Sequence, residues 1–410
     1  MNRSFRIAAL ITFINALSAT VLIPVIYLYA RAFELTDLQA GLLLSTFSAA
    51  QFFATPIMGK LSDRFGRKPL LVISLMGTVI ANFLASSASF LPLSIGCVVL
   101  FSARFFDGMT GGNVSVAQAI VADVTEPKDR AKAYGIFGAA FGMGFVVGPV
   151  ISLVAQKLTE GMGTKISLGA AFFASSILAT IALTLTLLFL PETLPPEKRK
   201  VGGRWFDLGL KELAQGFFLP RIGILILLNF LIGTTFTIFT FGFQPYYTKV
   251  LDQGNLSLTG LFVMIGVLGA SSQLGGVPWL SKRTTLTKIL FAGLLVRGFT
   301  FLVMPIWPDI RYFIGVGIVF ALFNAMVQPM ISTLVSLNVT PERQGIASGL
   351  NSSYLSIANA VGPVIAGLMV NEKFPISYSY PLYFAGVATL GTLGLAIVTR
   401  DRYKPDGIEI

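Results

Sequence analysis

The sequence of 410 residues contains no histidine and only one cysteine, Cys97. Without histidine the chain lacks an imidazole general base and the commonest metal ligand in proteins. A single cysteine excludes a disulfide within the chain and a thiolate metal cluster. The sequence also has no nucleophile with a neighbouring base and no G-x-x-x-x-G-K-[ST] phosphate loop. It therefore predicts no enzyme activity, no metal site and no cofactor.

Charged residues are scarce as well, at 12% of the chain, whereas hydrophobic residues make up 54%. An ordinary soluble domain carries roughly 25% charged residues, and a helix needs about 20 mostly apolar residues to span a bilayer. Such runs recur along the chain, separated by short segments with Lys, Arg, Pro or Asp. We therefore expect an all-α membrane protein with twelve transmembrane helices. The expected helices cover residues 5–30, 39–58, 70–90, 93–122, 132–156, 166–190, 220–248, 257–280, 287–305, 310–338, 344–370 and 378–399.

Lysine and arginine exceed aspartate and glutamate by 30 to 19, which gives a net charge of +11. If the N-terminus is cytoplasmic, the cytoplasmic segments hold 22 of the 30 lysines and arginines. This asymmetry follows the positive-inside rule and predicts that both termini are cytoplasmic. The protein is then a multi-pass protein of the inner (plasma) membrane, and the basic excess reports topology. We expect no nucleic-acid partner.

The composition changes at residues 191–219, where Pro, Gly and charged residues gather in PETLPPEKRKVGGRWFDLGLKELAQGFFL. We expect a cytoplasmic linker there, between a six-helix bundle of residues 1–190 and a second one of residues 220–410 with a short cytoplasmic tail. An internal repeat supports this division, because residues 127–151 align without a gap with residues 341–365 and both segments contain VGPVI. The two halves are therefore expected to be pseudo-symmetric, with the substrate path at their interface.

The segment GKLSDRFGRKPLL follows the second expected helix. Its glycine permits a positive backbone φ, and its basic side chains suit anionic headgroups. The pattern G-x-L-x-D-R-x-G-R-K resembles the signature loop of the major facilitator superfamily. This resemblance implies a conformational latch, in which Asp63 closes the cytoplasmic side against the helix that starts near residues 343–346. The alternative is a loop that only anchors the topology. The latch residues are Gly59, Asp63, Arg64, Gly66, Arg67 and Lys68.

The fifth expected helix contains the glycine-rich run GIFGAAFGMGFVVGPVI. Its G-x-x-x-G-P block resembles the signature of the drug and proton antiporters of that superfamily, which favours export over uptake. Small residues also let helices approach closely, so packing is the alternative role for each glycine. The block comprises Gly138, Gly142, Gly144, Gly148 and Pro149.

The fourth expected helix carries two charges, Arg104 and Asp107, within FSARFFDGMTGG. A spacing of three places them on one helix face, close enough to pair. Arginine followed four residues later by Gly108 resembles the superfamily's helix 4 motif, which implies a role in proton transfer or cavity electrostatics. Asp107 is also the one acid expected deep in the membrane, where a charge indicates a functional site. The pair is therefore the candidate for proton coupling, and the alternative is a neutralised pair that only orders helix packing.

The chain resembles the tetracycline and multidrug proton antiporters over nearly its whole length. It departs from the tetracycline exporters where those have membrane acids, since it has Asn15 and Asn82 at two such positions and Arg297 near a third. Each difference removes a protonatable group. The broader exporter group remains the expected relationship.

A cavity lined by aromatic side chains and a few amides would suit a large amphipathic ligand. Aromatic stripes on helices more often serve packing, and the intramembrane cation of Arg297 keeps an organic anion or zwitterion open as substrate. The expected cavity residues are Asn15, Asn82, Phe236, Phe239, Gln244, Arg297, Asn324, Gln328, Asn351, Tyr354 and Asn359.

These features predict a monomeric secondary active transporter that exports an amphipathic small molecule by alternating access, driven by protons and embedded in the lipid bilayer. Two alternatives stay open. One is a proton-independent facilitator or uptake carrier of a small organic solute, and the other is a membrane scaffold that no longer transports. The intact DRFGRKP loop speaks against the scaffold, because a protein that never switches needs no latch.

Overall fold

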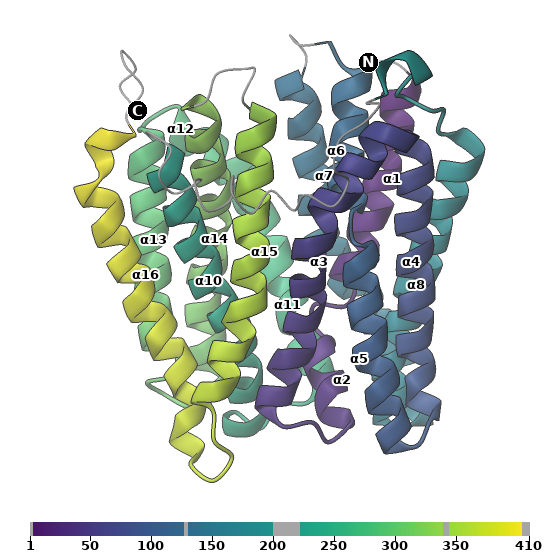
Figure 1. Ribbon diagram of the computed structural model, residues 1–410. Coiled ribbons are helices and arrows are strands. Elements are labelled where there is room, and N and C mark those ends of the chain that lie inside the picture. The colour runs from purple at the N-terminus through teal and green to yellow at the C-terminus, as the bar shows by residue number, and fades with distance from the viewer. Residues whose placement is uncertain (1–2, 127–129, 200–221, 339–343, 404–410) are drawn as a thin grey trace. The chain divides into compact units, whose positions relative to one another are not determined.

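The computed structural model describes residues 3–126, 130–199, 222–338 and 344–403, and these residues form helices and turns without a strand (Figure 1). In this part of the chain, ten helices are long and apolar enough to cross a membrane. The expectation of an all-α membrane protein is therefore confirmed. Twelve helices in two six-helix bundles stay a prediction.

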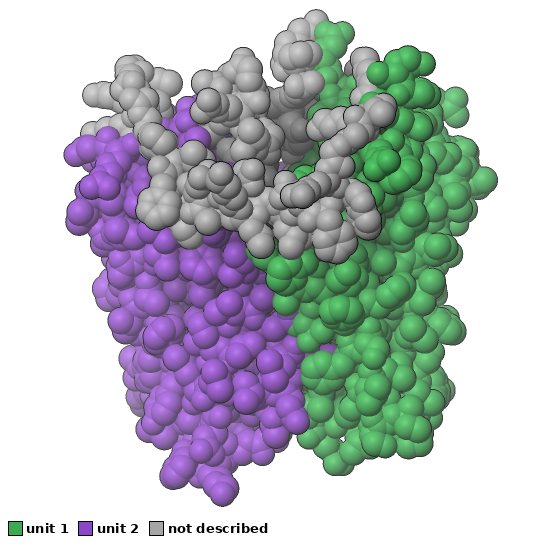
Figure 2. Space-filling model, in the orientation of Figure 1, with its two compact units in different colours: residues 1–35, 46–209 green, residues 36–45, 210–410 purple. Residues whose placement is uncertain are grey.

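The chain forms two compact units, shown in Figure 2. Unit 1 comprises residues 1–35 and 46–209, and unit 2 comprises residues 36–45 and 210–410. The helices before residue 200 are α1 (Arg3–Thr20), α2 (Ile26–Ala32), α3 (Asp37–Phe65), α4 (Arg67–Ser87), α5 (Leu93–Thr110), α6 (Asn113–Val124), α7 (Arg130–Leu158) and α8 (Thr164–Phe189). Those after residue 221 are α10 (Ile222–Pro245), α11 (Asn255–Ser271), α12 (Val277–Ser281), α13 (Leu286–Val303), α14 (Ile310–Leu337), α15 (Gln344–Met369) and α16 (Tyr380–Val398).

The first expected helix, residues 5–30, is interrupted. Helix α1 ends at Thr20, residues 21–25 form turns, and α2 begins at Ile26. The interruption contains Pro24, which has no N–H to donate and which clashes with the preceding turn of a helix. The fourth expected helix is likewise divided into α5 and α6, at Gly111 and Gly112.

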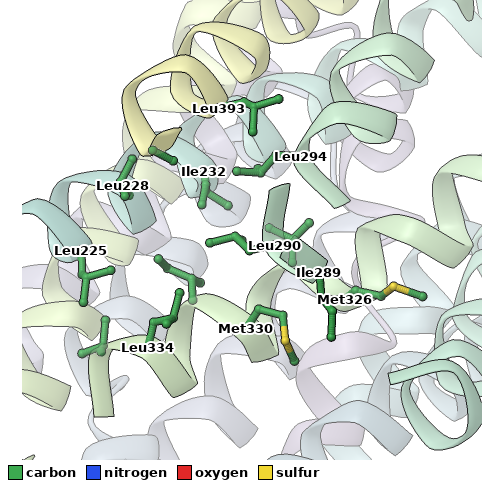
Figure 3. Close-up of a cluster of buried hydrophobic side chains, with 14 of the residues drawn as sticks. Leu225, Leu228, Ile232, Ile289, Leu290, Leu294, Met326, Met330, Leu334 and Leu393 are labelled. Carbon is green, nitrogen blue, oxygen red and sulfur yellow. The ribbon is translucent and has the colours of Figure 1, made fainter. Parts of the chain in front are cut away.

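Each unit has its own apolar core. In unit 1 the core joins α1, α3, α4, α6 and α8. In unit 2 it joins α10, α13, α14 and α16, and Figure 3 shows the buried leucine, isoleucine and methionine side chains that converge there. Many large apolar side chains are instead exposed, among them Leu158, Leu188 and Val398 at 80%, 69% and 83%. Because lipid tails are as apolar as these side chains, close packing and hydrogen bonds hold such helices together.

A similar helix joint occurs once in each unit, and its residues on α7 and α15 are equivalent in the repeat. In unit 1, the Thr20 hydroxyl of α1 donates to the Gly144 carbonyl of α7 over 2.7 Å, and Gly148 packs against Thr20. In unit 2, the Thr237 hydroxyl of α10 donates to the Ala358 carbonyl of α15 over 3.0 Å, and Gly362 packs against Thr237.

A Cβ added at either glycine would overlap its threonine. The glycines of the VGPVI segments therefore permit a close helix contact.

We predict that Gly362→Ala lowers the stability of the protein by about 1–3 kcal/mol, since the added methyl group overpacks a tight joint. Thermal unfolding of the purified protein in detergent measures this change. Gly391→Ala in α16 is the matched control, because no atom lies within 4 Å of a Cβ there. Equal unfolding midpoints for the two variants would show that the helix contact at Gly362 is not tight enough to exclude a methyl group.

Candidate functional site

Arg104 and Asp107 form a buried ion pair on α5. Arg104 Nη1 lies 3.1 Å from Asp107 Oδ2, and the two residues are only 7% and 6% exposed. The other carboxylate oxygen, Oδ1, accepts a hydrogen bond of 3.0 Å from the Thr78 hydroxyl of α4. Both oxygens of Asp107 are thus engaged by donors from two helices.

Gly108 brings a third helix to this pair. A Cβ at Gly108 would overlap the Phe47 carbonyl oxygen of α3 and lie 2.7 Å from the Ala50 Cβ. The glycine thereby lets α3 approach α5, and the Phe47 ring centroid lies 4.4 Å from the Arg104 guanidinium carbon. The ring face attracts the cation. In the R-x-x-x-G pattern, Arg104 therefore supplies the charge, and Gly108 permits the close approach of the helix whose ring packs against that charge.

The pair has unequal hydrogen bonding. Arg104 Nε is buried and has no hydrogen-bond partner among the described residues, whereas Asp107 is bonded through both oxygens. A proton added to Oδ2 would neutralise the carboxylate and weaken its hold on Arg104 Nη1. A role of this pair in proton coupling stays a prediction.

Other expected polar residues lie on α1 and α4. Asn82 is 2% exposed and lies one helical turn beyond Thr78 on α4. The Asn15 side-chain oxygen on α1 accepts a hydrogen bond of 3.0 Å from the Asn113 amide on α6. The sequence analysis missed Thr78 and Asn113. Their hydrogen-bond partners, Asp107 and Asn15, lie 29 and 98 residues away along the chain. The sequence of an apolar run does not reveal which distant residue its polar side chain will bond.

The GKLSDRFGRK segment, expected as a loop, is the end of α3 and the start of α4 with only Gly66 between them, and charged side chains hold it in unit 1. Gly66 adopts a φ of 106°, as expected. Arg67 bridges two acids, with Nη1 at 2.6 Å from Asp63 Oδ1 and Nε at 3.0 Å from Asp123 Oδ2. The expected partner of Asp63 near residues 343–346 lies outside the residues whose side chains the structure describes. The latch therefore stays a prediction.

Glu192 is a member of this network that the sequence analysis placed in the linker. Its two carboxylate oxygens accept hydrogen bonds from the backbone N–H groups of Arg67 and Lys68, at 2.9 and 3.2 Å. The acid thus caps the N-terminus of α4, where a negative charge is favourable. In return, Lys68 Nζ donates to the Leu187 carbonyl near the end of α8, at 2.9 Å. The signal for this cap in the sequence was a glutamate just after the end of the expected helix 166–190.

The glycine block of α7 has a packing role where it is described. Gly148 contacts Thr20, and a Cβ at Gly144 would lie 3.2 Å from the Ala16 Cβ of α1. Pro149 lies within the helix. Gly142 lies in the same helix, and Gly138 lies in the stretch of α7 for which the structure describes the backbone alone. Whether the block also sets the direction of transport stays a prediction.

Unit 2 buries a cation that has no counter-ion among the residues that the structure describes. Arg297 of α13 is 2% exposed, and it makes no ion pair among the residues that the structure describes. Its Nη2 donates to the Ile232 carbonyl over 2.7 Å and to the Thr235 hydroxyl over 3.0 Å, both on α10. Its guanidinium carbon lies 5.1 Å from the Phe236 ring centroid, and Nε has no partner within the described chain. The Ile232 carbonyl, the Thr235 hydroxyl and the face of the Phe236 ring therefore stabilise the guanidinium in place of a carboxylate.

Three amides connect α10, α14 and α15. The Asn229 amide donates to Asn351 Oδ1 over 2.6 Å, and the Gln328 amide donates to Asn229 Oδ1 over 3.2 Å. Asn229 is 1% exposed and was missed by the sequence analysis, whereas Gln328 and Asn351 keep exposed atoms. The structure thus brings these two expected cavity residues together.

The remaining expected cavity residues fall into two groups. Phe239 and Gln244 are buried inside unit 2 at 2% and 1% exposed, and the Phe239 ring stacks on Phe301 with centroids 3.9 Å apart. Tyr354 is 5% exposed and meets Phe230 edge to face. Three others are partly exposed: Phe236, Asn324 and Asn359. Their membership of a substrate cavity stays a prediction.

We predict that Glu192→Ala destabilises the protein by about 1 kcal/mol, the typical cost of losing a helix cap. The thermal unfolding midpoint in detergent checks this. Glu197→Ala is the control, because Glu197 is an exposed acid in the same segment. The cap would have no energetic role if both variants unfolded at the wild-type temperature.

Comparisons with known proteins agree with the sequence motifs. The multidrug resistance protein 1 of Bacillus subtilis (strain 168) is 26% identical over 402 residues, which cover 96% of this chain and 94% of that protein. The class B tetracycline resistance protein of Escherichia coli is 27% identical over 399 residues, which cover 92% and 90%. A crystal structure of a D-xylose-proton symporter has the same fold, with a TM-score of 0.75, 16% identity and coverage of 98% and 97%.

The model of one protein family matches nearly the whole chain. It is described as the Major Facilitator Superfamily, and it matches residues 8–296 and 277–409. The resemblance of the GKLSDRFGRK loop to this superfamily is thereby confirmed. The chain belongs to the Major Facilitator Superfamily and is an integral, multi-pass membrane transporter, not an enzyme.

Proposed function

We propose that this transporter exports an amphipathic small molecule in exchange for protons, by alternating access between its two halves. The buried Asp107, bonded to Arg104 and Thr78, carries this proposal. It is the one Asp or Glu within the twelve expected helices, and the chain has no histidine to take its place. A deep carboxylate is the group that a proton-coupled cycle needs in order to carry a proton across the hydrocarbon core.

The hydrogen bonds of Asp107 suggest how a proton acts on the protein. In the carboxylate form, Asp107 ties Arg104 and Thr78 together, and so ties α5 to α4. A proton on Asp107 frees Arg104 and favours a different arrangement of these helices. Exchange follows if the substrate favours the arrangement with the carboxylate, because each ligand then weakens the binding of the other by the same factor.

Export is the favoured direction because two relatives that match over almost their whole length are named for drug resistance. The glycine block of α7 supports the same direction through its resemblance to the antiporter signature. The symporter with the same fold shares only 16% identity, so it does not decide the direction. Arrangement in the plasma membrane with both termini in the cytoplasm, and action as a monomer, complete the proposal.

Arg297 is buried without an ion-pair partner among the described residues, and this favours one class of substrate over others. A cation inside the membrane is costly unless a negative group compensates it, and no carboxylate does so among the described residues. A substrate with a negatively charged group would supply this compensation. We therefore favour an organic anion or a zwitterion with a large apolar part.

A proton-independent facilitator or uptake carrier is the second candidate. Asn15 and Asn82 favour it, because they stand where the tetracycline exporters have acids, and Asn15 is bonded to another neutral amide, Asn113. The scaffold without transport is not retained, because the chain belongs to a family of transporters.

The test of proton coupling uses the protein in vesicles with an imposed pH gradient and a panel of anionic, zwitterionic and cationic amphipathic dyes. We predict that the wild-type protein accumulates at least one dye against its gradient. Asp107→Asn should abolish this uphill movement and keep the exchange of labelled for unlabelled dye, because the neutral amide cannot exchange a proton.

Asp252→Asn is the control for this test, because it removes an exposed acid at a position with positive φ that asparagine tolerates. Uphill movement of the dye by Asp107→Asn at the wild-type rate would reject proton coupling through this residue and would favour the second candidate.

A second prediction concerns Arg297→Met in the same vesicles. The KM for an anionic or zwitterionic dye should rise by at least about 30-fold, which corresponds to about 2 kcal/mol for the loss of one partner of a buried charge pair. Transport of a cationic dye should not fall. The thermal unfolding midpoint should stay level or rise, because an apolar residue replaces a buried charge that has no ion-pair partner among the described residues.

Arg311→Gln is the control for Arg297→Met, because Arg311 is an exposed arginine near the start of α14. Equal losses for anionic and cationic dyes, together with a lower unfolding midpoint, would show that Arg297 only supports the packing of α13 against α10.

A further inference from the structure

A small groove lies on unit 2 between α12, α13 and α14. Its volume is about 260 Å³, which is just below the range of roughly 300–1,000 Å³ for pockets that hold small molecules. Apolar side chains line most of it, from Leu280, Ile289, Ala292, Phe323 and Met326, and Thr284 and Lys288 contribute the polar groups. The groove therefore fits a segment of an apolar chain with a negative group attached, and it is too small for a whole drug-sized ligand.

The groove opens onto the face of α13 that points away from the core of unit 2. Lys288, Ala292, Leu295 and Phe299 are all exposed and follow one another at helical spacing. Leu295 and Phe299 remain 43% and 52% exposed although α13 is a candidate membrane span. An exposed apolar stripe on such a helix is a surface for lipid, so acyl chains have direct access to the groove.

The stretch of chain that contains α12 and α13 carries charge of one sign. The chain has no Asp or Glu between Asp252 and Asp309, whereas the same stretch contains Lys282, Arg283 and Lys288 close to the groove. Lys288 lies in the first turn of α13, where the helix dipole also favours an anion. It makes no ion pair among the residues that the structure describes.

The position of the basic residues matches the surface of a membrane. Trp279 is 54% exposed, and the Arg283 guanidinium lies 4.1 Å from the centre of its ring. Tryptophan and arginine at the end of a membrane span typically lie at headgroup level. The apolar groove therefore begins where the headgroups lie and runs into the hydrocarbon region.

We infer that this groove binds one anionic phospholipid, with its phosphate at Lys288 and an acyl chain between Leu280, Ala292 and Phe323. The site differs from the Arg104–Asp107 pair and from the GKLSDRFGRK loop, which both belong to unit 1. Binding there does not depend on whether transport is coupled to protons.

Native mass spectrometry of the purified protein tests this site, with phosphatidylglycerol and phosphatidylcholine of identical acyl chains as probes. We expect one phosphatidylglycerol molecule to bind more tightly than phosphatidylcholine. Lys288→Gln should weaken phosphatidylglycerol about 5-fold, the effect of about 1 kcal/mol for one basic residue near a membrane surface. Ala292→Phe should remove the tight site for both lipids, because the ring fills the groove.

Two variants serve as controls. Lys249→Gln removes an exposed lysine at another helix end, and Leu295→Phe enlarges a residue on the same exposed stripe that does not line the groove. Both should bind phosphatidylglycerol as the wild type does. Unfolding midpoints equal to the wild type will show that each variant is folded.

Four results would overturn the inference. The first is equal binding of the two lipids, and the second is an unchanged tight site in Ala292→Phe. The third is displacement of phosphatidylglycerol by millimolar glycerol phosphate, which would indicate a site for a soluble anion. A loss in Lys249→Gln as large as that in Lys288→Gln would also overturn it, because general surface charge would then explain the binding.

Discussion

Two opposite charges in a hydrocarbon environment have to compensate each other, and this constraint organises unit 1. Arg104 and Asp107 pair along α5, Thr78 supplies a donor from α4, and Phe47 supplies a ring from α3. Each partner needs a close helix approach. Gly108 permits the approach of α3, and Gly77 packs against Thr110 where the Ser74 hydroxyl of α4 also donates to the Thr110 carbonyl. Small residues around the pair are therefore as necessary as the charges themselves.

The two halves share a framework and differ in charge. The joint of Thr20 with Gly148 recurs as the joint of Thr237 with Gly362, so the sequence repeat corresponds to a repeated packing contact. Unit 1 buries the ion pair of Arg104 with Asp107, whereas Arg297 of unit 2 is buried without an ion-pair partner among the residues that the structure describes. A repeated framework with different charges suits a division of roles, in which one half responds to protons and the other to the charge of the substrate.

The sequence predicts the features that depend on neighbours along the chain. The spacing of three in Arg104 and Asp107 gives the ion pair, the glycine in GKLSDRFGRK gives the positive φ of Gly66, and the long apolar runs give the membrane helices. It does not predict Thr78, Asn113, Glu192 or Asn229, because their partners come from helices far away in the chain. The break between α1 and α2 was missed as well, although Pro24 marks it.

In the proposed exchange, a proton on Asp107 and the bound substrate weaken each other's binding. The most direct measurement is the release of protons from the purified protein when it binds a transported compound, followed with a pH-indicator dye in weakly buffered detergent solution. The account predicts that the wild-type protein releases protons at a saturating concentration of the compound and that Asp107→Asn releases none. Saturable binding to the wild type without any release of protons, over a pH range in which transport occurs, would contradict it.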